Sequence, residues 1–281
     1  MRTAPFAHTG IDVPVIGQGT WNIEHDDPDE AVAALDAGLD AGMTHIDTAE
    51  LYGRGDVERL ISPIVRQRRD EIFLVSKVLP QNASYDRTLK ACEQSLQRLG
   101  TDHLDVYLLH WRESGTPLEE TFRAFDALQQ AGKIRYYGVS NFDVEDLEEA
   151  VGIVGEGRIA CNQVLYHLNE RSIEQRVIPW CKEHGIAVVA YSPFGSGRFP
   201  STRTNGGRVL ASIAERRNIS VYQVALAFLV QQGNVFAIPK AARVEHVLDN
   251  ALAGDLELTR AEMQSISDAF PMKPRKSLPM I

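Results

Sequence analysis

The chain has 281 residues, of which 44% are hydrophobic and 24% charged, and a formal net charge of −9. Acidic and basic residues are interspersed, which argues against non-specific nucleic-acid binding, because that function calls for a basic face. The sequence also lacks an apolar run of the ~20 residues that cross a bilayer and the basic and apolar regions of a signal peptide, so we expect a cytoplasmic protein without nucleic-acid or membrane partners.

Short apolar, β-branched segments alternate with longer amphipathic segments along the chain. The predicted strands cover residues 14–19, 44–48, 72–77, 104–110, 136–141, 159–164, 186–192 and 235–240. The predicted helices cover residues 27–42, 55–68, 84–100, 116–132, 144–154, 172–185, 207–218, 220–233 and 244–254. Continuous apolar strands that alternate with helices predict a parallel sheet buried on both faces.

This alternation of strands and helices favours a closed (β/α)₈ TIM barrel, with a doubly wound open sheet as the alternative. We expect residues 1–281 to form a single domain. Residues 6–17, with a turn at His8–Gly10, predict a hairpin that caps the barrel floor. Residues 259–270 predict an extra C-terminal helix, followed by a tail from Pro271. Cysteines occur only at positions 92, 161 and 181, an odd and widely spaced set that predicts reduced thiols.

Titratable side chains collect at the ends of three consecutive predicted strands. Asp47 ends the second strand and Tyr52 follows it, Lys77 ends the third strand, and His110 ends the fourth. In a (β/α)₈ barrel the carboxyl ends of the strands and the loops after them form the active site. The sequence therefore brings an acid, a phenol, an ammonium and an imidazole to one mouth of the barrel.

These four groups make chemical sense together. A tyrosine has a pKa of about 10, too high for an efficient proton donor at neutral pH. A neighbouring ammonium lowers that pKa, and a carboxylate keeps the ammonium charged and in place. An imidazole can donate a hydrogen bond to a carbonyl oxygen and stabilise the charge that develops on it. The set predicts a site that protonates an alkoxide as it forms.

Each of these residues also has a structural interpretation when taken alone. Asp47 is a candidate helix N-cap, Tyr52 a loop aromatic, Lys77 a solvated strand end and His110 a packed histidine. Their joint placement favours catalysis. A metal-dependent hydrolase that uses His45, Asp47 and His110 is a rival, but it leaves Lys77 beside a divalent cation and Tyr52 idle, so no metal site is expected.

The chain resembles the aldo-keto reductases, and in particular the bacterial NADPH-dependent members of the type that reduces 2,5-diketo-gluconate or methylglyoxal. The motifs that carry the resemblance are GQGTW at 17–21, DTAELYG at 47–53, SK at 76–77, LDVYLLHW at 104–111, GKIRYYGVSNF at 132–142, NQVLYH at 162–167 and AYSPFG at 190–195. The resemblance implies an oxidoreductase with Tyr52 as general acid, Lys77 tuning it, Asp47 pairing with Lys77, and His110 orienting the carbonyl. A nucleotide-binding regulatory subunit with little turnover is the alternative.

The resemblance also implies how NADPH is held. The nicotinamide carboxamide would contact Ser140, Asn141 and Gln163, its ring would stack on Tyr191, and Lys240 would bind the 2′-phosphate near the start of the last barrel helix. The full set of implied cofactor residues is Gly19, Thr20, Trp21, Asp47, Ser140, Asn141, Gln163, Tyr191, Ser192, Pro193, Gly195, Ile238, Pro239, Lys240, Ala241, Arg243, His246, Asp249 and Asn250.

The phosphate segment departs from the usual family pattern. Ala241 replaces a serine, His246 an arginine and Asp249 a glutamate, while Arg243 restores some positive charge. An arginine clamps phosphate through two hydrogen bonds and stays charged, whereas a histidine does neither dependably at neutral pH. We expect NADPH as the cofactor, with NADH as a secondary cofactor left open.

The implied substrate site lies between two tryptophans. Trp21 and Trp111 match the aromatic walls beside Tyr52 and His110, which suits small aldehydes and ketones such as methylglyoxal, aryl aldehydes, and keto acids or esters. Residues 192–205 match a strap over the cofactor, and the tail of 11 residues from Pro271 is too short for an elaborate lid. The expected partner is a small carbonyl compound, and the expected state is a monomer, with a dimer left open.

Overall fold

The computed structural model describes residues 1–112, 115–273, 275 and 277–280, so positions 274, 276 and 281 of the predicted tail lie outside the described residues. In this part of the chain eight parallel strands form one sheet whose order follows the sequence. The strands are β3 (Gln18–Gly19), β4 (His45–Asp47), β5 (Phe73–Val78), β6 (Leu104–Leu109), β7 (Ile134–Ser140), β8 (Ile159–Leu165), β9 (Ala187–Tyr191) and β10 (Val235–Ala237).

The first and last strands of this sheet meet and close it into a barrel. Ala237 donates its backbone N–H to the carbonyl of Val15 at 2.9 Å, and Gly17 donates to the carbonyl of Ala237 at 2.8 Å. A doubly wound sheet reverses its strand order at a switch point and leaves two open edges. The sequential order and the closure exclude that alternative and confirm the predicted (β/α)₈ barrel.

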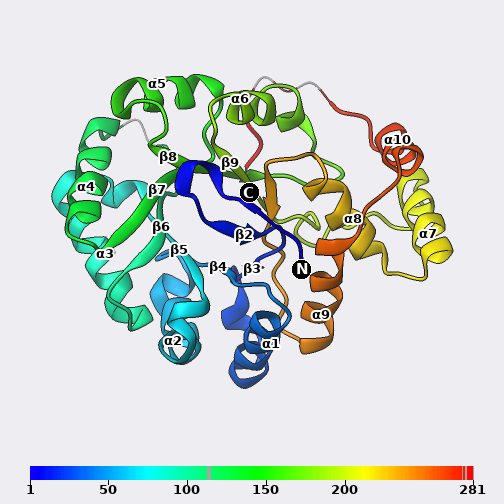
Figure 1. Cartoon of the computed structure of the whole chain (residues 1–281), viewed down its shortest axis with the longest axis horizontal. Coiled ribbons are helices and arrows are strands. Elements are labelled where there is room, and N and C mark those ends of the chain that lie inside the picture. The colour runs from blue at the N-terminus through cyan, green and yellow to red at the C-terminus, as the bar shows by residue number, and fades with distance from the viewer. Residues whose placement is uncertain (113–114, 274, 276, 281) are drawn as a thin grey trace.

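Helices surround the strands as an outer ring (Figure 1). They are α1 (Pro28–Asp40), α2 (Asp56–Arg68), α3 (Tyr85–Leu99), α4 (Leu118–Gln130), α5 (Val144–Val154), α6 (Val177–Glu183), α8 (Val221–Val230) and α9 (Val244–Leu252). A further helix, α7 (Asn205–Arg217), lies outside this ring and packs on α8. The predicted helix over 172–185 is shorter than expected, because a separate 3₁₀ turn at Ser172–Glu174 precedes α6.

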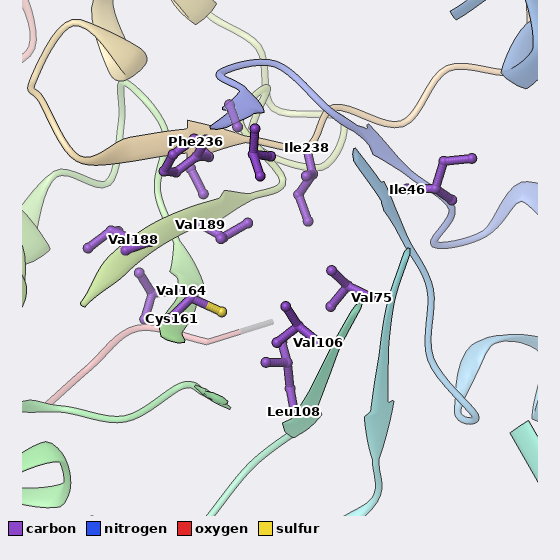
Figure 2. Close-up of a cluster of buried hydrophobic side chains, with 14 of the residues drawn as sticks. Ile46, Val75, Val106, Leu108, Cys161, Val164, Val188, Val189, Phe236 and Ile238 are labelled. Atoms are coloured by element: carbon purple, nitrogen blue, oxygen red, sulfur yellow. The ribbon is translucent and has the colours of Figure 1, made fainter. Parts of the chain in front are cut away.

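The barrel interior is filled by the alternate side chains of the strands. Figure 2 shows Val75, Val106, Val189 and Ile238 pointing into the space that the strands enclose, and all four are buried. Side chains two residues apart on a strand share a face. A polar residue two positions beyond an inward apolar residue therefore faces the mouth at the carboxyl end of the barrel, directly above a dry core.

The opposite end of the barrel is closed by the predicted hairpin, β1 (Thr3–Pro5) paired antiparallel with β2 (Asp12–Pro14). Its first strand begins earlier than expected, because Phe6 turns into the barrel instead of extending a strand. The Phe6 ring is fully buried and lies 5.0 Å from the rings of Phe73 and Phe236. Phe6 thus fills the floor of the barrel, at the end opposite to the strand ends that carry the polar groups.

The predicted extra helix is α10 (Arg260–Ala269), which begins with a capping box between Thr259 and Glu262 and packs on α7. Arg171 fixes its far end by donating to the carbonyl of Phe270 at 2.7 Å. In the tail, Arg275 forms an ion pair with Glu170 at 2.5 Å. Among the described helices, none is both long and apolar enough to cross a membrane.

Candidate active site

Three strand ends and the loop after β4 bring the four predicted catalytic side chains together. The Lys77 Nζ donates to Asp47 Oδ1 at 2.6 Å and to the Tyr52 Oη at 3.0 Å. The Tyr52 and His110 rings meet edge to face with centroids 5.9 Å apart. Lys77 lies two residues after Val75 on β5, so both side chains face the inside of the barrel. His110 lies four residues after Val106, directly after the end of β6, and faces the same way. The strand period thus places these groups above the core.

The loop after β4 is shaped so that Tyr52 turns back toward Lys77. Gly53 and Gly55 adopt positive φ values of 53° and 91°, and Arg54 between them has a φ of 55°. Glycine enters this left-handed region without the steric penalty of a side chain. The two glycines let the chain reverse within a few residues and enter α2, which leaves Tyr52 buried over the end of β5.

Burial dominates the electrostatics of the centre. It raises the pKa of Tyr52 above its usual value, and Lys77 only partly opposes this shift. Lys77 lowers the pKa of Tyr52, as expected, but burial outweighs this effect, so the net shift is upward. Burial also disfavours the charged form of Lys77, but the Asp47 carboxylate and Tyr52 outweigh it and raise the pKa of Lys77. Lys77 is an ammonium, and Tyr52 is a protonated phenol at neutral pH.

His110 is held as a neutral imidazole. Burial, together with the positive charge of Lys77, lowers its pKa well below the usual 6.5. Its ring stacks on that of Trp111, with centroids 3.8 Å apart and planes 11° from parallel. The Nδ1 atom is buried and has no hydrogen-bond partner among the described residues. A neutral ring of this kind can still donate one N–H to a carbonyl oxygen.

A second layer of hydrogen bonds fixes these groups. Gln163 donates from Nε2 to Asp47 Oδ2 at 2.7 Å, so both carboxylate oxygens of Asp47 are engaged. Asn141 donates from Nδ2 to the carbonyl of His110 at 3.1 Å and accepts from the Tyr191 hydroxyl at 2.9 Å. Asn141 and Gln163, predicted as carboxamide ligands, thus also hold His110 and Asp47 of the predicted catalytic set in place, which no sequence pattern revealed.

The centre opens into a cleft at the carboxyl ends of the strands. Its lining combines predicted catalytic, cofactor and substrate residues with one residue that the sequence analysis did not predict. The lining residues are Gly19, Thr20, Trp21, Asp47, Leu51, Tyr52, His110, Trp111, Asn141, Gln163, Tyr191, Ser192, Ile238 and Lys240. The unpredicted residue is Leu51, whose side chain is 37% exposed. Leu51 directly precedes Tyr52 in the motif DTAELYG, and this position could have indicated that it lines the site.

Other predicted cofactor residues lie outside the lining of this cleft. They are Ser140, Pro193, Gly195, Pro239, Ala241, Arg243, His246, Asp249 and Asn250. The Ser140 hydroxyl donates to the backbone carbonyl of Gln163 at 2.8 Å. Asp249 accepts hydrogen bonds from Ser220 and Gln223, both at 2.6 Å, so its carboxylate is engaged with the start of α8.

The predicted phosphate segment lies at the rim of the cleft, where the loops after β3 and β10 meet. Lys240 forms an ion pair with Asp26, a residue of the β3–α1 loop. Arg243 is the N-cap residue of α9, and its guanidinium lies 3.7 Å from the Glu245 carboxylate. His246 lies 3.6 Å from the same carboxylate. The rim thus combines basic side chains with a helix N-terminus, and both features attract anions.

The geometry does not favour the metal-dependent hydrolase. The His45 ring meets the rings of Phe6 and Phe73 edge to face, at 6.1 and 5.4 Å between centroids. Asp47 is engaged by Lys77 and Gln163. Across the described ranges, no three His, Cys, Asp or Glu side chains are grouped so as to hold a metal ion. His45 is a packed barrel residue.

Comparison with known proteins gives one consistent family. The model of the aldo/keto reductase family matches residues 15–270. The chain is 43% identical over 275 residues to methylglyoxal reductase YeaE of Escherichia coli, covering 96% of both chains. It is 36% identical to glyoxal reductase of Bacillus subtilis, covering 92% of this chain and 90% of the relative. A crystal structure of an aldo/keto reductase from Klebsiella pneumoniae, in complex with NADP and acetate, superposes with a TM-score of 0.92 at 42% identity and full coverage of both chains.

Proposed function

The chain belongs to the aldo/keto reductase family and is an oxidoreductase, and from that premise we propose that it reduces small aldehydes and ketones to alcohols with NADPH. The observation that carries this proposal is the buried contact of Lys77 with both Asp47 and Tyr52 beside His110. It is an arrangement built to deliver one proton to an oxygen at the floor of the cleft.

We assign the proton transfer to Tyr52. Because Lys77 donates to the Tyr52 oxygen, the phenolic proton is free to point into the cleft. As negative charge develops on the carbonyl oxygen, Tyr52 gives up this proton, and the Lys77 ammonium stabilises the phenolate that remains. The neutral His110 ring donates an N–H to the same oxygen and orients it. Asp47 keeps Lys77 charged and fixed in position.

The residues of the cleft fit a nicotinamide cofactor. Asn141 and Gln163 present carboxamide groups beside the Tyr191 ring, close to Tyr52 and His110. These groups can hold a flat amide-bearing ring by hydrogen bonding and stacking. When bound, a reduced nicotinamide supplies the hydride. At the rim, Lys240 and Arg243 with the α9 N-terminus supply positive potential for the 2′-phosphate. The Klebsiella pneumoniae relative crystallised with NADP supports this choice of nucleotide.

The substrate side of the cleft is apolar. Trp21 and Leu51 are each 37% exposed, and Trp111 stands beside His110. An apolar wall with one polar corner suits small aldehydes and ketones. We therefore include 2-oxoaldehydes such as methylglyoxal, aryl aldehydes, and keto acids or esters among the substrates. The relatives named methylglyoxal reductase and glyoxal reductase support the first of these classes.

We further propose that residues 1–281 form one domain that works as a cytoplasmic monomer. The strands of one closed barrel and the tail contact between Arg275 and Glu170 support a single unit. Cys92, Cys161 and Cys181 are buried free thiols, as expected in a reducing compartment. A regulatory subunit with little turnover remains the second candidate, but it leaves the intact proton-donor network without a use.

The test is oxidation of NADPH, and separately of NADH, by the purified protein with methylglyoxal, an aryl aldehyde and a keto acid. Substrate-dependent turnover that favours NADPH is the expected result. Equal or better turnover with NADH would preserve the reductase and overturn the choice of cofactor. Tight nucleotide binding without turnover of any carbonyl compound would favour the regulatory subunit instead.

A further inference from the structure

The phosphate rim contains an acidic residue that no sequence pattern assigned to the site. Lys240 is 31% exposed, and its ammonium is paired with the Asp26 carboxylate, which is 36% exposed. The backbone of Gly19 donates to Pro239 at 3.1 Å, which fixes the β3–α1 loop beside the segment that carries Lys240. The pair therefore bridges the first and last loops of the barrel mouth.

A second positive charge at the rim also has a carboxylate beside it. Arg243, the other permanent cation, lies within 3.7 Å of the Glu245 carboxylate. Lys240 and Arg243 thus each have an acidic neighbour, which lowers the positive potential at the rim before a ligand arrives. An approaching phosphate meets less positive potential than the sequence of basic residues suggests.

We propose that Asp26 is a residue that sets cofactor specificity, because it holds Lys240 as an internal counter-ion. The inference rests on the proposed function, in which Lys240 receives the 2′-phosphate. A nucleotide with that phosphate must draw Lys240 away from Asp26 before the ammonium can bind the phosphate. A nucleotide with a free 2′-hydroxyl leaves the pair intact. Asp26 therefore weakens binding of the 2′-phosphorylated nucleotide. It also reduces the protein's preference for that nucleotide over the unphosphorylated one.

The size of the effect follows from the exposure of the pair. Partly exposed ion pairs are screened by water and contribute little to stability. Removing the competing carboxylate is therefore expected to tighten binding of a 2′-phosphorylated nucleotide about three- to fivefold. Binding of a nucleotide without the 2′-phosphate is expected to change by less than about twofold, because it does not compete with Asp26 for Lys240.

The experiment measures binding of 2′,5′-ADP and of 5′-ADP by isothermal titration calorimetry, without any carbonyl substrate. Asp26→Asn is the test variant, since it removes the charge and keeps the size. Asp29→Asn is the matched control, because Asp29 is an exposed carboxylate on α1 outside this ion pair. Both variants are repeated in a Lys240→Met background. We expect Asp26→Asn to tighten 2′,5′-ADP alone, and to do so only when Lys240 is present.

Several outcomes would overturn the inference. Unchanged or weaker 2′,5′-ADP binding in Asp26→Asn would mean that Asp26 is neutral or orients Lys240 for the phosphate. The inference also fails if Asp29→Asn tightens 2′,5′-ADP binding equally, or if Asp26→Asn tightens 5′-ADP binding equally. It fails as well if Asp26→Asn tightens 2′,5′-ADP binding equally in the Lys240→Met background. Each of these results would mean that the change in overall charge, and not release of Lys240, causes the tighter binding. A failure of the proposed function looks different. In that case Lys240→Met by itself leaves 2′,5′-ADP binding unchanged, or the wild type reduces no carbonyl compound with either cofactor.

Discussion

The proposed catalytic centre and the proposed phosphate rim each contain a lysine paired with an aspartate, but the two pairs differ in how deeply they are buried. In the centre, the Lys77 and Asp47 side chains are almost fully buried, and each is held by several partners. At the rim, the Lys240 and Asp26 side chains are about one-third exposed, and the ion pair joins two loops. A buried charge without its partner is costly, whereas an exposed one is solvated. The centre is therefore fixed by folding, and the rim is free to be tuned for its ligand.

The largest expected effect comes from Lys77→Met, which breaks the centre. It leaves the Asp47 carboxylate buried without its cation, so we expect the free energy of unfolding to fall by about 3–5 kcal/mol. It also removes the charge that stabilises the Tyr52 phenolate, so kcat for carbonyl reduction should fall at least about a thousandfold. Urea unfolding and steady-state kinetics measure the two effects.

The double variant Lys77→Met with Asp47→Asn separates them. Neutralising both partners removes the unpaired charge, so most of the lost stability should return while kcat stays low. If the double variant is as unstable as Lys77→Met, the buried charge is not the source of the instability. If it regains activity, the ammonium is not needed for proton transfer.

Lys240→Met makes the matching change at the rim, with a smaller expected effect. We expect NADPH to bind about tenfold more weakly, because one charged hydrogen bond to the phosphate is lost. The free energy of unfolding should change by less than about 0.5 kcal/mol, because the side chain is partly exposed. Lys90→Met, an exposed lysine on α3, is the control. Strong destabilisation by Lys240→Met would remove the contrast between the two regions.

The buried His45 ring makes the stability of the protein depend on pH. Burial, reinforced by Lys77, lowers its pKa to about 3. The unfolded chain takes up a proton near pH 6.5 and the folded chain does not, so stability falls as the pH drops below about 6.5. Between pH 7.5 and 5.5 His45 should contribute a loss of about 1–1.5 kcal/mol. His45→Leu should lose correspondingly less stability over this range in urea unfolding, and an identical loss in both proteins contradicts the account.

The smallest expected change is in the pH dependence of catalysis. The pKa of His110 lies well below 6.5 and that of Tyr52 above its usual range, so neither group changes protonation near neutrality. We therefore expect kcat for reduction to vary less than about twofold between pH 6.5 and 8.5. A steep fall with an apparent pKa near 7 would show that one of the two groups titrates there.

The sequence predicted the centre better than the rim, for a physical reason. Asp47, Lys77 and His110 sit at strand ends, and the period of two in a strand together with barrel closure determines where they point. The contact of Asp26 with Lys240 depends on how two loops meet, which no local pattern encodes. The sequence did not predict the upward net shift of the Tyr52 pKa, because the burial that raises it comes from the whole fold, whereas the lysine that lowers it was visible in the sequence.

Differences between the predicted and observed bounds of two elements also arise from contacts between distant parts of the chain. The first strand of the hairpin at the floor is Thr3–Pro5, and Phe6, directly after it, packs its ring against Phe73 and Phe236 inside the barrel. The helix expected from residue 172 separates into a 3₁₀ turn and α6, with Arg171 and Glu174 engaged next to α10. In both cases tertiary packing overrides a local pattern that was otherwise interpreted correctly.

The most direct test of the central claim compares wild type and Tyr52→Phe, each loaded with NADPH, in the reduction of methylglyoxal. Protein fluorescence measures NADPH binding, and single-turnover kinetics measures reduction. We expect the variant to bind NADPH within about twofold of wild type and to lose reduction by about a thousandfold or more, because only the proton donor is missing. A variant that binds NADPH and reduces methylglyoxal at a rate near that of wild type would contradict the assignment of Tyr52 as the acid.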